Sequence, residues 1–509
     1  MKIIIPIASH DKDIIQNYSS IKPLIKLGSK SMIETFVKNF KFNYEYIFLC
    51  RKQDLIETNL LKVLNNLKIK KKIVSINKST SSAIETVFFA EKYLKPNDKV
   101  LICHPDGINI FFSKSKFEKS LNTSNDGVIF AFHEESQTNT SETHTGRIIV
   151  EKNKLIQVLE KSIKTKNSKR LAGLYFFKNW SVFKKYAHDT FNNQQPVRGR
   201  FFISQVYNEY IKNKKKIKLF YLKKHIAFGL VPYIEEFNFW HKYFKKNIKK
   251  KLKNKFNFIN LIPSCGIGQR FLIKNKKNFK PLVKVDKKFM ITKTIQSLPI
   301  SKKNITIIRK DHDQKYNFKS KILKNNKNSE VIILNKKTDG MATTCYQYIK
   351  DFKKKTPLLI SSCDYAVIFD EEKLKKIINY FNPDVLIWTF RKYPDARIAP
   401  FAYAYCEIKN GSVNKISEKT PISDNPHLDH IAQGIFYFKS NEIFMKAYEK
   451  MIIQKNKINN EYYVGNSINE LIKENYTVMP FEVDQYICLG TLKDLEVYNF
   501  WSGFFNDKI

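Results

Sequence analysis

An internal repeat constrains this 509-residue chain more than any other feature of its sequence. The segment Lys22–Leu27 (KPLIKL) returns 258 residues later as Lys280–Val285 (KPLVKV). Further segments return at the same offset or at one of 261 residues: Leu101–Asp106 as Leu359–Asp364, Glu160-Lys161 as Glu418-Lys419, Gly173 as Gly434 and Gly229 as Gly490. Solenoid repeats are only about 20–50 residues long, so a period this large indicates two homologous domains.

The repeat predicts three parts of the chain, which are a first domain over 1–244, a basic linker over 245–257 and a second domain over 258–509. Apolar residues recur every four positions from Phe244 to Phe256, a spacing that is typical of an amphipathic helix. A basic helix of this kind attaches some proteins to an anionic membrane or to nucleic acid. We favour a linker helix with one docked face, because runs of charge are usually solvated faces.

Within each copy, short β-branched runs alternate with stretches of helical periodicity. The expected strands of the first copy are Ile3–Ile7, Tyr46–Cys50, Lys99–Cys103 and Gly127–Phe132, and its expected helices are Ile33–Phe40, Asp54–Leu67 and Ala83–Leu94. The second copy has matching strands at Asn260–Pro263, Ile305–Arg309, Leu358–Ser362 and Val385–Thr389. This alternation predicts two tandem Rossmann-like, doubly wound α/β domains with mainly parallel sheets. Ligands of such sheets bind beyond the carboxyl ends of the strands.

The charge of the chain bears on its partners. There are 90 Lys and Arg against 47 Asp and Glu, which gives a formal charge of +43. Only nine of the basic residues are Arg, the residue that suits bidentate recognition of phosphates and bases, and the Lys are spread along the whole chain. We therefore interpret the charge as a bias of composition and expect no nucleic acid as partner.

Composition also predicts the compartment. A hydrophobic content of 43% excludes a disordered basic tail, and no apolar run approaches the roughly 18 residues that span a bilayer. The apolar stretch at the N-terminus is too short for a secretory signal. The seven cysteines form no C-x-x-C pair, which disfavours a zinc site or a disulfide framework. These features predict a cytoplasmic protein without a membrane span.

The second copy carries a candidate phosphate-binding loop directly after its first strand. Gly266 and Gly268 are spaced by one residue and allow backbone N–H groups to turn toward an anion. Arg270 follows two residues later and Lys280 ten residues after that, so two cations converge on the loop. A tight turn alone would also explain the glycines. The first copy keeps Lys22-Pro23 without the glycines, so we expect Lys280-Pro281 to serve the fold as well as the phosphate site.

This ordered set resembles the nucleotidyltransferase family of sugar-1-phosphate nucleotidylyltransferases, which opens with A-G-x-G-x-R followed by K-P-L. The likeness continues through Thr338–Ala342, similar to the family's T-x-G-x-A loop, and through Asp364, where the family carries a metal-binding aspartate. Glu418-Lys419, Gly434 and Leu489–Thr491 extend the match over residues 253–509 and, more faintly, over 1–244. The resemblance implies a GT-A-like form of the Rossmann-like architecture.

The resemblance also implies an activity. A nucleoside triphosphate, CTP or UTP, would donate its NMP to a phosphorylated small molecule such as a sugar phosphate, with release of pyrophosphate. By analogy, the product would serve surface polysaccharide biosynthesis. The implied roles are catalysis by Arg270 and Lys280, binding of Mg²⁺ by Asp364, nucleotide binding by Gly266, Gly268, Thr338 and Gly340, and acceptor binding by Glu418, Lys419 and Gly434.

Some of these residues have simpler structural alternatives. Asp364 would then cap the turn after its strand. Glu418-Lys419 would form a surface ion pair. For Gly434 we favour a packing role over a ligand contact.

The second copy departs from the family at one position. Many relatives carry an aspartate, the second metal ligand, two residues before the late Gly-Thr pair, and Cys488 stands there in this chain. Asp484 is one candidate replacement. The other is a metal held by Asp364 and the phosphates alone.

The first copy has lost most of the motif. Where the second copy has Gly266–Arg270, the first reads Ser9–Asp13, with two acids that repel a triphosphate. Lys22, Asp106 and Glu160 remain. We expect this degenerate copy to scaffold, regulate or bind the acceptor rather than to turn over, and a divergent active domain is the alternative.

Two other functions stay open at this point. A GT-A-type glycosyltransferase usually needs a D-x-D metal pair, whereas neither Asp364 nor Asp106 has a second acid at that spacing. A non-catalytic, nucleotide-binding regulatory protein would need both copies inactive, and the motif Gly266–Arg270 argues against that.

Overall fold

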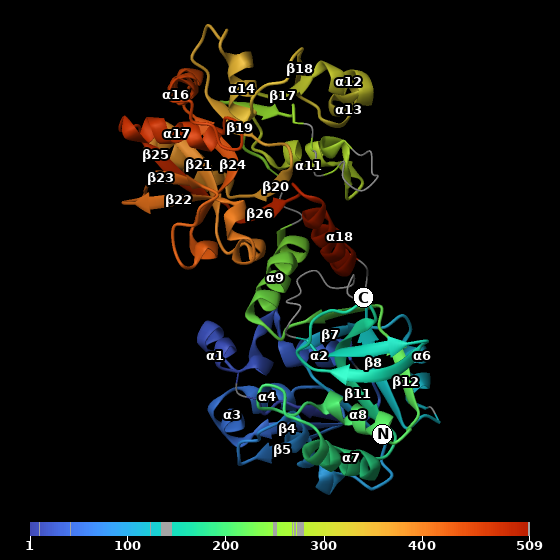
Figure 1. Ribbon diagram of the computed structural model, residues 1–509. Coiled ribbons are helices and arrows are strands. Elements are labelled where there is room, and N and C mark those ends of the chain that lie inside the picture. Colours follow the sequence, from blue (N-terminus) through green and yellow to red (C-terminus); the bar gives the residue numbers. More distant parts are fainter. Residues whose placement is uncertain are drawn as a thin grey trace. The chain divides into compact units, whose positions relative to one another are not determined.

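A computed structural model describes the chain except for residues 10, 41, 123, 134–144, 248–251, 267, 269–270, 272–278 and 507–509. It contains two compact units, Met1–Asn238 (unit 1) and Phe239–Ile509 (unit 2), which are described separately. Figure 1 shows unit 1 in blue to green and unit 2 in green to red. The domain limits at 244 and 258 that the repeat suggests stay predictions.

A nine-stranded mixed sheet forms the centre of unit 1. Its main path is β5-β4-β1-β6-β11-β8-β12, and the hairpin β9-β10 flanks the first half of β11. All neighbours along this path are parallel except at β11, which runs against both β6 and β8. The strands are β1 (Lys2–Pro6), β4 (Glu45–Arg51), β5 (Lys71–Ile76), β6 (Val100–Cys103), β8 (Gly127–Phe132), β9 (Arg147–Glu151), β10 (Lys154–Leu159), β11 (Ser168–Phe177) and β12 (Ile217–Tyr221), with two small sheets formed by β2 (Lys26–Leu27) and β3 (Lys30–Ser31), and by β7 (Gly107–Ile110) and β13 (Lys224–Ala227).

Unit 2 contains a nine-stranded sheet with the same connectivity. Its main path is β18-β17-β14-β19-β24-β21-β25, and the hairpin β22-β23 flanks the first half of β24. Here β24 is the strand that runs against its neighbours. The strands are β14 (Ile259–Pro263), β17 (Lys303–Arg309), β18 (Ser329–Leu334), β19 (Leu358–Ser361), β21 (Val385–Phe390), β22 (Ala404–Lys409), β23 (Ser412–Glu418), β24 (His430–Phe438) and β25 (Val478–Glu482), with two small sheets formed by β15 (Lys284–Val285) and β16 (Lys288–Phe289), and by β20 (Tyr365–Ile368) and β26 (Gln485–Cys488).

Corresponding residues pair in the two units. Ile102 lies opposite Tyr175 in unit 1, and Ile360 lies opposite Phe436 in unit 2, which are 258 and 261 residues further along. The small sheets repeat this agreement, with Gly107 opposite Ala227 in unit 1 and Tyr365 opposite Cys488 in unit 2. The prediction of two Rossmann-like α/β domains with mainly parallel sheets is confirmed.

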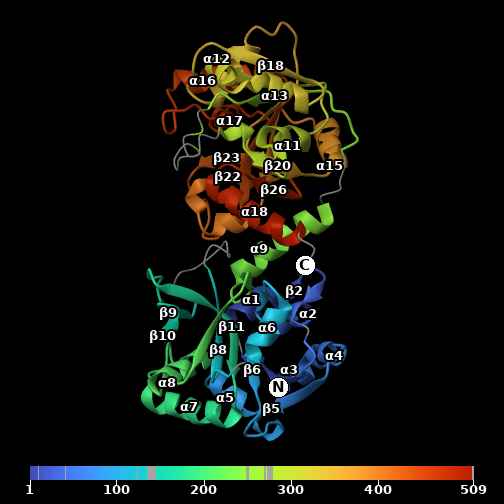
Figure 2. The ribbon, with the colours of Figure 1, turned by 90° about the vertical axis from the view of Figure 1, so that its right-hand side faces the viewer.

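Helices cover both faces of each sheet, because alternate strand residues are apolar on both sides. In unit 1, Ile102 belongs to one core with α5, α7 and α8, and Leu101 to a second core with α2, α4 and α6. Figure 2 shows α7 and α8 on one side of this sheet and α2, α3 and α4 on the other. The helices of unit 1 are α1 (Lys12–Tyr18), α2 (Met32–Asn39), α3 (Lys52–Glu57), α4 (Leu60–Asn65), α5 (Ala83–Phe88), α6 (Lys114–Leu121), α7 (Trp180–Asn193), α8 (Val206–Lys212) and α9 (Val231–His241), which ends in unit 2.

Unit 2 has the same two-sided construction. Ile360 packs with α14, α16 and α17, whereas Leu359 packs with α11, α13 and α15 on the opposite face. The helices of unit 2 are α11 (Met290–Ser297), α12 (Lys310–Tyr316), α13 (Phe318–Asn325), α14 (Met341–Ile349), α15 (Glu371–Lys376), α16 (Asn441–Ile453), α17 (Val464–Lys473) and α18 (Leu492–Asn506).

Three helices expected from periodicity are wrong in extent. The helix expected over Ala83–Leu94 ends at Phe88 as α5, and a separate 3-10 helix spans Glu91–Tyr93. The stretch Asp54–Leu67 forms two short helices, because the Thr58 hydroxyl accepts a hydrogen bond from Leu60 N (3.1 Å) and interrupts the backbone ladder. The expected linker helix does not extend to Phe256. Residues 252–257 are not helical, since Asn254 N donates to the Glu371 carboxylate (2.9 Å) and Phe256 N donates to Ile300 O (2.7 Å).

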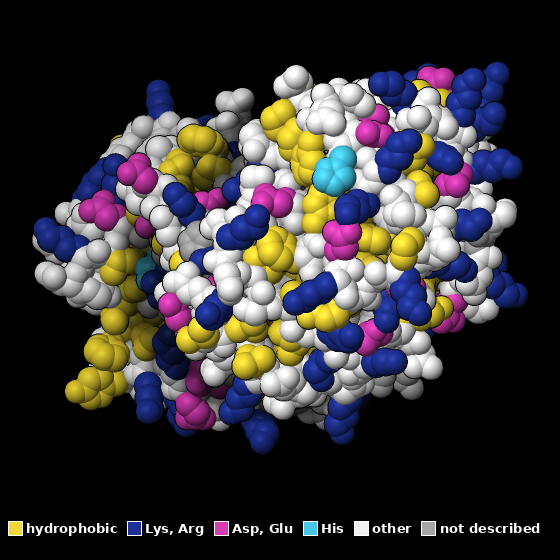
Figure 3. Space-filling model, turned by 90° about the horizontal axis from the view of Figure 1, so that it is seen from below, with side chains coloured by type: hydrophobic (Ala, Val, Ile, Leu, Met, Phe, Trp, Pro, Cys, Tyr) yellow, Lys and Arg dark blue, Asp and Glu magenta, His cyan; other side chains and the backbone are white. Residues whose placement is uncertain are grey.

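Basic side chains lie scattered over the face seen in Figure 3, with acidic and hydrophobic side chains between them. This distribution agrees with the spread of Lys along the sequence. None of the helices in the described part of the chain combines the length and the apolar character needed to cross a bilayer.

A β-bulge interrupts the antiparallel strand of each unit at the same place. In unit 2 the register of β24 against β21 shifts between Ile387 and Thr389, and Gly434 lies in the bulge with φ +77°. Gly173 occupies the equivalent bulge of unit 1 with φ +69°. The left-handed conformation favours glycine. The bulge bends β24 and changes the direction of its side chains.

We expect Gly434→Ala to lower the free energy of unfolding by more than the roughly 1–2 kcal/mol that a positive φ alone costs. A Cβ at Gly434 would lie 3.0 Å from the Tyr365 hydroxyl, whereas one at Gly411, which has the same φ of +77°, would meet nothing within 4 Å. Gly411→Ala is therefore the matched control, and urea denaturation of both variants measures the difference. Equal losses would show that the contact with Tyr365 costs nothing.

Candidate active site

A cleft of about 530 Å³ lies in unit 2 where the chain leaves β19. Residues that line it come from loops after several strands, as expected for a doubly wound sheet. It brings together five of the residues predicted from the sequence, which are Lys280, Asp364, Glu418, Lys419 and Gly434.

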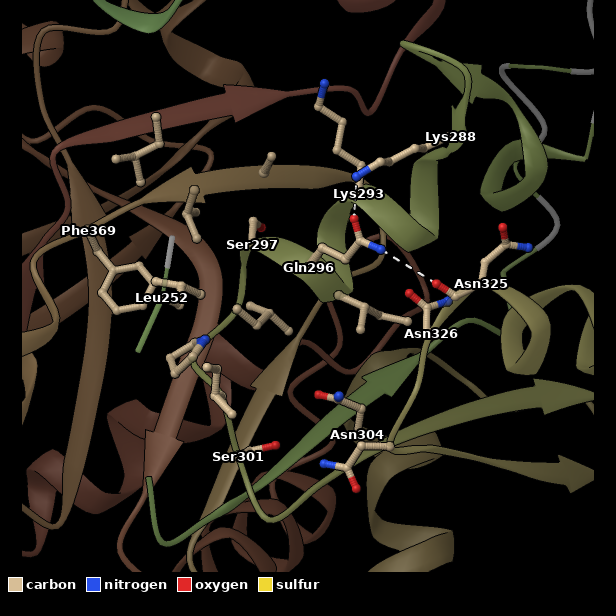
Figure 4. A pocket seen from close by; sticks show the side chains of 18 of the residues that line it. Leu252, Lys288, Lys293, Gln296, Ser297, Ser301, Asn304, Asn325, Asn326 and Phe369 are labelled. Atoms are coloured by element: carbon tan, nitrogen blue, oxygen red, sulfur yellow. Dashed lines mark hydrogen bonds between the residues drawn. The ribbon is translucent and has the colours of Figure 1, made fainter. Parts of the chain in front are cut away.

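A larger cavity of about 950 Å³ lies elsewhere in unit 2 and has none of these residues in its lining. Figure 4 shows apolar side chains such as Leu252 and Phe369 on one part of its wall and amides such as Gln296 on another. Lys288 donates to Gln296 Oε1 (2.6 Å), and Asp286 in the same lining is held by Lys293 at 2.6 Å. The described glycines of the phosphate-binding motif, Gly266 and Gly268, line neither space, but Lys280 and Asp364 line the smaller cleft, so we take that cleft as the candidate site.

A partly buried ion pair lies in the lining of the cleft. Lys280 Nζ lies 2.6 Å from Asp364 Oδ2, and the Ser362 hydroxyl donates to Asp364 Oδ1. Burial by itself would raise the pKa of Asp364, but the charge of Lys280 and the hydrogen bonds outweigh it and hold this pKa below its ordinary value. Burial would likewise lower the pKa of Lys280, but Asp364 reverses the shift and raises it. Both groups are therefore ionised at neutral pH.

The predicted glycine loop packs against this pair. Gly268 has φ +66°, and a Cβ there would lie 2.9 Å from Lys280 Cβ, so only glycine allows the loop to approach Lys280 so closely. Phe271 N donates to Gly268 O (2.8 Å), and the Lys280 ammonium lies 5.6 Å from the centre of the Phe271 ring. Gly266 is exposed with open space around it. Arg270 lies outside the described residues, and its role stays a prediction.

Thr338 and Gly340, the residues predicted to bind the nucleotide, lie next to the cleft but are not part of its lining. Gly340 precedes α14 with φ +108°, and a Cβ there would lie 2.7 Å from the backbone N and O of Tyr462. The Thr338 hydroxyl is 2.6 Å from that of Thr344 and holds the loop to the helix. Met341, the next residue, lines the cleft.

The predicted acceptor residues form the other part of the cleft. Burial raises the pKa of Glu418, and the neighbouring charge of Lys419 offsets this only in part. The Lys419 ammonium lies 5.9 Å from the centre of the Tyr463 ring. Gly434 lines the cleft and its carbonyl accepts a hydrogen bond from the Tyr365 hydroxyl, so it packs against the wall as well.

Asp364, the predicted metal ligand, lines the cleft together with the further acids Asp395, Glu418, Glu461 and Asp494. Its neighbours fit only part of the family pattern. Burial raises the pKa of Cys488 well above its ordinary value, so its thiol is neutral. Asp484 directly precedes β26, and Cys488 is the last residue of that strand, so the two lie at opposite ends of it. Asp484 is exposed and does not line the cleft, so it is not the replacement metal ligand that the sequence suggested. Within the described ranges, no three His, Cys, Asp or Glu side chains gather closely enough to hold a metal ion alone.

Sequence reasoning missed several polar residues of the lining, among them Asp494 and Gln433 as well as Asp395, Glu461 and Lys493. Asp494 Oδ2 accepts hydrogen bonds from Thr491 N (2.8 Å) and from the Cys488 thiol (3.3 Å). The spacing T-x-x-D at the start of α18 is a capping-box signal that would have found it. Gln433 carries no such signal, because the side-chain alternation expected of a strand gives no warning of the bulge beside it.

Unit 1 keeps the ion pair but has further acids beside it. Lys22 Nζ lies 2.8 Å from Asp106 Oδ2 and 3.9 Å from Asp11 Oδ2, so two carboxylates neutralise the one ammonium. Burial raises the pKa of Glu160, the counterpart of Glu418, to about 7, although the Ser204 hydroxyl donates a hydrogen bond to its carboxylate.

Known proteins resemble this chain at the level of one family model and of several solved structures. A family model described as nucleotidyl transferase matches residues 259–496. A solved nucleoside-diphosphate-sugar pyrophosphorylase from Vibrio cholerae RC9 is 17% identical over 48% of this chain and 99% of its own, with a TM-score of 0.39. The inositol-1-phosphate CTP transferase from T. maritima is 12% identical over 50% of this chain and 99% of its own, with a TM-score of 0.38. A search of curated proteins finds no match.

We expect Glu160→Gln to remove a pH dependence from the stability of unit 1. Because the folded-state pKa of Glu160 is raised from 4.5 to about 7, its contribution is fully present below pH 4.5 and is lost as the pH rises through 7. The wild-type chain should lose up to about 3 kcal/mol relative to the variant between pH 5 and pH 8. Denaturant unfolding of the full chain at several pH values measures this, with exposed Glu57→Gln as control. Parallel curves for wild type and Glu160→Gln would contradict the expectation.

Proposed function

We propose that unit 2, in which residues 259–496 match a family model described as nucleotidyl transferase, transfers an NMP from CTP or UTP to a phosphorylated small molecule such as a sugar phosphate. The observation that carries the proposal is the single cleft that holds Lys280 with Asp364 in one part and Lys419 with Glu418 in another. A cation in each part suits a reaction between two phosphorylated substrates, because their phosphates repel one another unless neutralised.

The reaction needs no nucleophile from the protein. An oxygen of the acceptor phosphate attacks the α-phosphorus, a new phosphoanhydride bond forms, and the bond to the bridging oxygen breaks as pyrophosphate leaves. Catalysis of such a transfer consists mainly of positioning and neutralisation of charge. We assign Lys280 and Arg270 to the charge on the phosphates, and the backbone at Gly266 and Gly268 to the cradle that holds them. Asp364 fixes Lys280 in the charged state before substrate arrives.

Asp364 also fits a role as the protein ligand of Mg²⁺. Bound Mg²⁺ would neutralise charge on the phosphates. Magnesium commonly binds through one or two carboxylates and completes its shell with phosphate oxygens and water, so one aspartate meets this need. The neutral thiol of Cys488 is a poor ligand for so hard a cation.

The remaining site residues receive the base and the acceptor. Thr338 and Gly340 would face the base from the loop before α14. Lys419 would hold the acceptor phosphate and Glu418 its polar groups, with Gly434 shaping the wall between them. The activated product would suit a later transfer reaction such as those of surface polysaccharide biosynthesis.

We propose that unit 1 is a degenerate copy, descended with unit 2 from one duplicated domain, that does not turn over. The repeated register of the two sheets supports the duplication. Asp11 beside Lys22 supports the loss of activity, because this carboxylate neutralises the cation that a triphosphate would need. A scaffolding, regulatory or acceptor-binding role is left for unit 1.

We expect Asp364→Ala and Arg270→Ala to reduce pyrophosphate release by at least roughly 100-fold, because each removes a group that meets the reacting phosphates. Asp106→Ala, at the equivalent position of unit 1, is the matched control and should retain turnover. Pyrophosphate release by the full-length chain with CTP or UTP, Mg²⁺ and a panel of phosphorylated acceptors measures both. Turnover that survives Asp364→Ala but not Asp106→Ala would transfer the activity to unit 1.

Triphosphate binding should be visible without turnover. We expect CTP or UTP to raise the Tm of the full chain more than ATP or GTP, because a ligand that binds only the folded state stabilises it by about 2.7 kcal/mol at 100 times its Kd. Lys280→Ala should abolish the shift and Lys22→Ala should leave it intact. A shift that is lost in Lys22→Ala instead would place the nucleotide in unit 1.

A further inference from the structure

The sheet of unit 2 ends in a strand whose outer edge lacks the usual protection against pairing. β18 is the first strand of the main path, and among the described strands it pairs with β17 alone. Figure 1 shows it beside β17. The outer row of backbone N–H and C=O groups on an edge strand can pair with a further strand. Proteins commonly prevent this with lysine or proline in the edge strand, or with a β-bulge.

The other three strands at the ends of the two main paths carry such residues. β5 contains two lysines, β12 contains Lys218 and β25 contains Pro480. β18, with the sequence SEVIIL, contains neither lysine nor proline, and its register on β17 runs over six residues without a shift. Its one charged residue, Glu330, is held by Lys303 of β17. The edge of unit 2 is therefore regular and mostly apolar.

Unit 1 has the same edge with polar residues. The register of β18 on β17 repeats that of β5 on β4 at the offset of 258 residues. At this offset Ile333 of β18 stands at the position of Ser75, and Leu323 of α13 stands at that of Asn65. Ile333 is 38% exposed and Leu323 is 41% exposed. One scaffold thus presents two apolar side chains at the edge of unit 2 and two polar ones at the edge of unit 1.

The exposed apolar side chains of unit 2 lie near one another. Val331 packs in the same core as Ile322 of α13, and α13 contacts β18. Side chains alternate along a strand, so Ile333 points to the same face of the sheet as Val331. Leu323 follows Ile322 on α13. A strand that added to β18 would therefore bring its own flanking residues against an apolar surface.

The charges along this segment favour a second copy of the chain as the added strand. Glu330 lies three residues before Ile333, and the exposed Lys336 lies three residues after it. In an antiparallel pairing centred on Ile333, each Glu330 therefore faces Lys336 of the other copy. Opposite charges directly across two strands are favourable, whereas a parallel pairing in register would place like charges together.

We propose that β18 forms the interface of a homodimer, in which two copies of this chain pair their β18 strands antiparallel about a twofold axis at Ile333. The pairing satisfies the outer backbone groups of both strands, joins the two unit 2 sheets into one, and closes, because each edge is used once. The inference goes beyond the proposed function and does not depend on it, since none of these residues lines the cleft.

Analytical ultracentrifugation of the full-length chain without substrates tests the interface. We expect the wild type to sediment as a dimer at micromolar concentration. Ile333→Lys should raise the dissociation constant at least roughly tenfold, because two lysines without partners then meet at the axis. Ser75→Lys, at the equivalent position of unit 1, is the matched control and should leave the dimer unchanged. A wild type that is monomeric at every concentration, or a dimer that Ile333→Lys leaves intact, would overturn the proposal.

A double-mutant cycle tests the antiparallel register, and it decides the question if Ile333→Lys fails to fold, because Lys336 is exposed and outside the strand. We expect Glu330→Gln and Lys336→Gln each to weaken the dimer, and their combined effect to be smaller than the sum, because they remove the two ends of one pair. Lys337→Gln is the matched control. It changes the net charge equally but faces Ser329, so its effect should add to that of Glu330→Gln. Additive effects for Lys336→Gln as well would overturn the pairing.

Discussion

A partly buried pair of lysine and aspartate occupies the equivalent place in each unit. Lys280 with Asp364, and Lys22 with Asp106, join the 3-10 helix of each K-P-L motif to the loop that follows the fourth strand of the sheet order. Loss of one member would leave a partly desolvated charge without its partner, which is unfavourable. In unit 2, Gly268 packs against Lys280, and Gly434 of the bulge lines the same cleft as the pair.

The two units share some features of the fold and differ in others. Both retain the ion pair and the glycine bulge, because these hold the loops against the sheet in any variant of the fold. They differ where a substrate would lie. Unit 1 places Asp11 beside its lysine and a hydroxyl on Glu160, so its charges are satisfied internally. Unit 2 leaves the equivalent positions to glycine and alanine, and its polar groups face an open cleft.

Much of the fold was predictable because it depends on local pattern. Buried strands such as Tyr46–Cys50 are continuous apolar runs, and this pattern results directly from a sheet that is covered on both faces. The boundaries that failed depend on single side chains or on tertiary contacts. The Thr58 hydroxyl divides one helix, and hydrogen bonds to Glu371 and Ile300 extend a segment whose apolar spacing is helical. Periodicity does not record such competition for backbone groups.

The sequence by itself determined the repeat and the α/β class, and the resemblance to the nucleotidyltransferase family pointed to Lys280, Asp364, Glu418 and Lys419. Only the tertiary structure decided which side chains share the cleft. It removed Asp484, which lies at the far end of β26, and it added Asp494 and Gln433. The physical reason is that a bulge or a strand end changes the direction in which a side chain points, and no periodic pattern of residues in the sequence records that change. Whether a side chain is buried or paired depends on that direction.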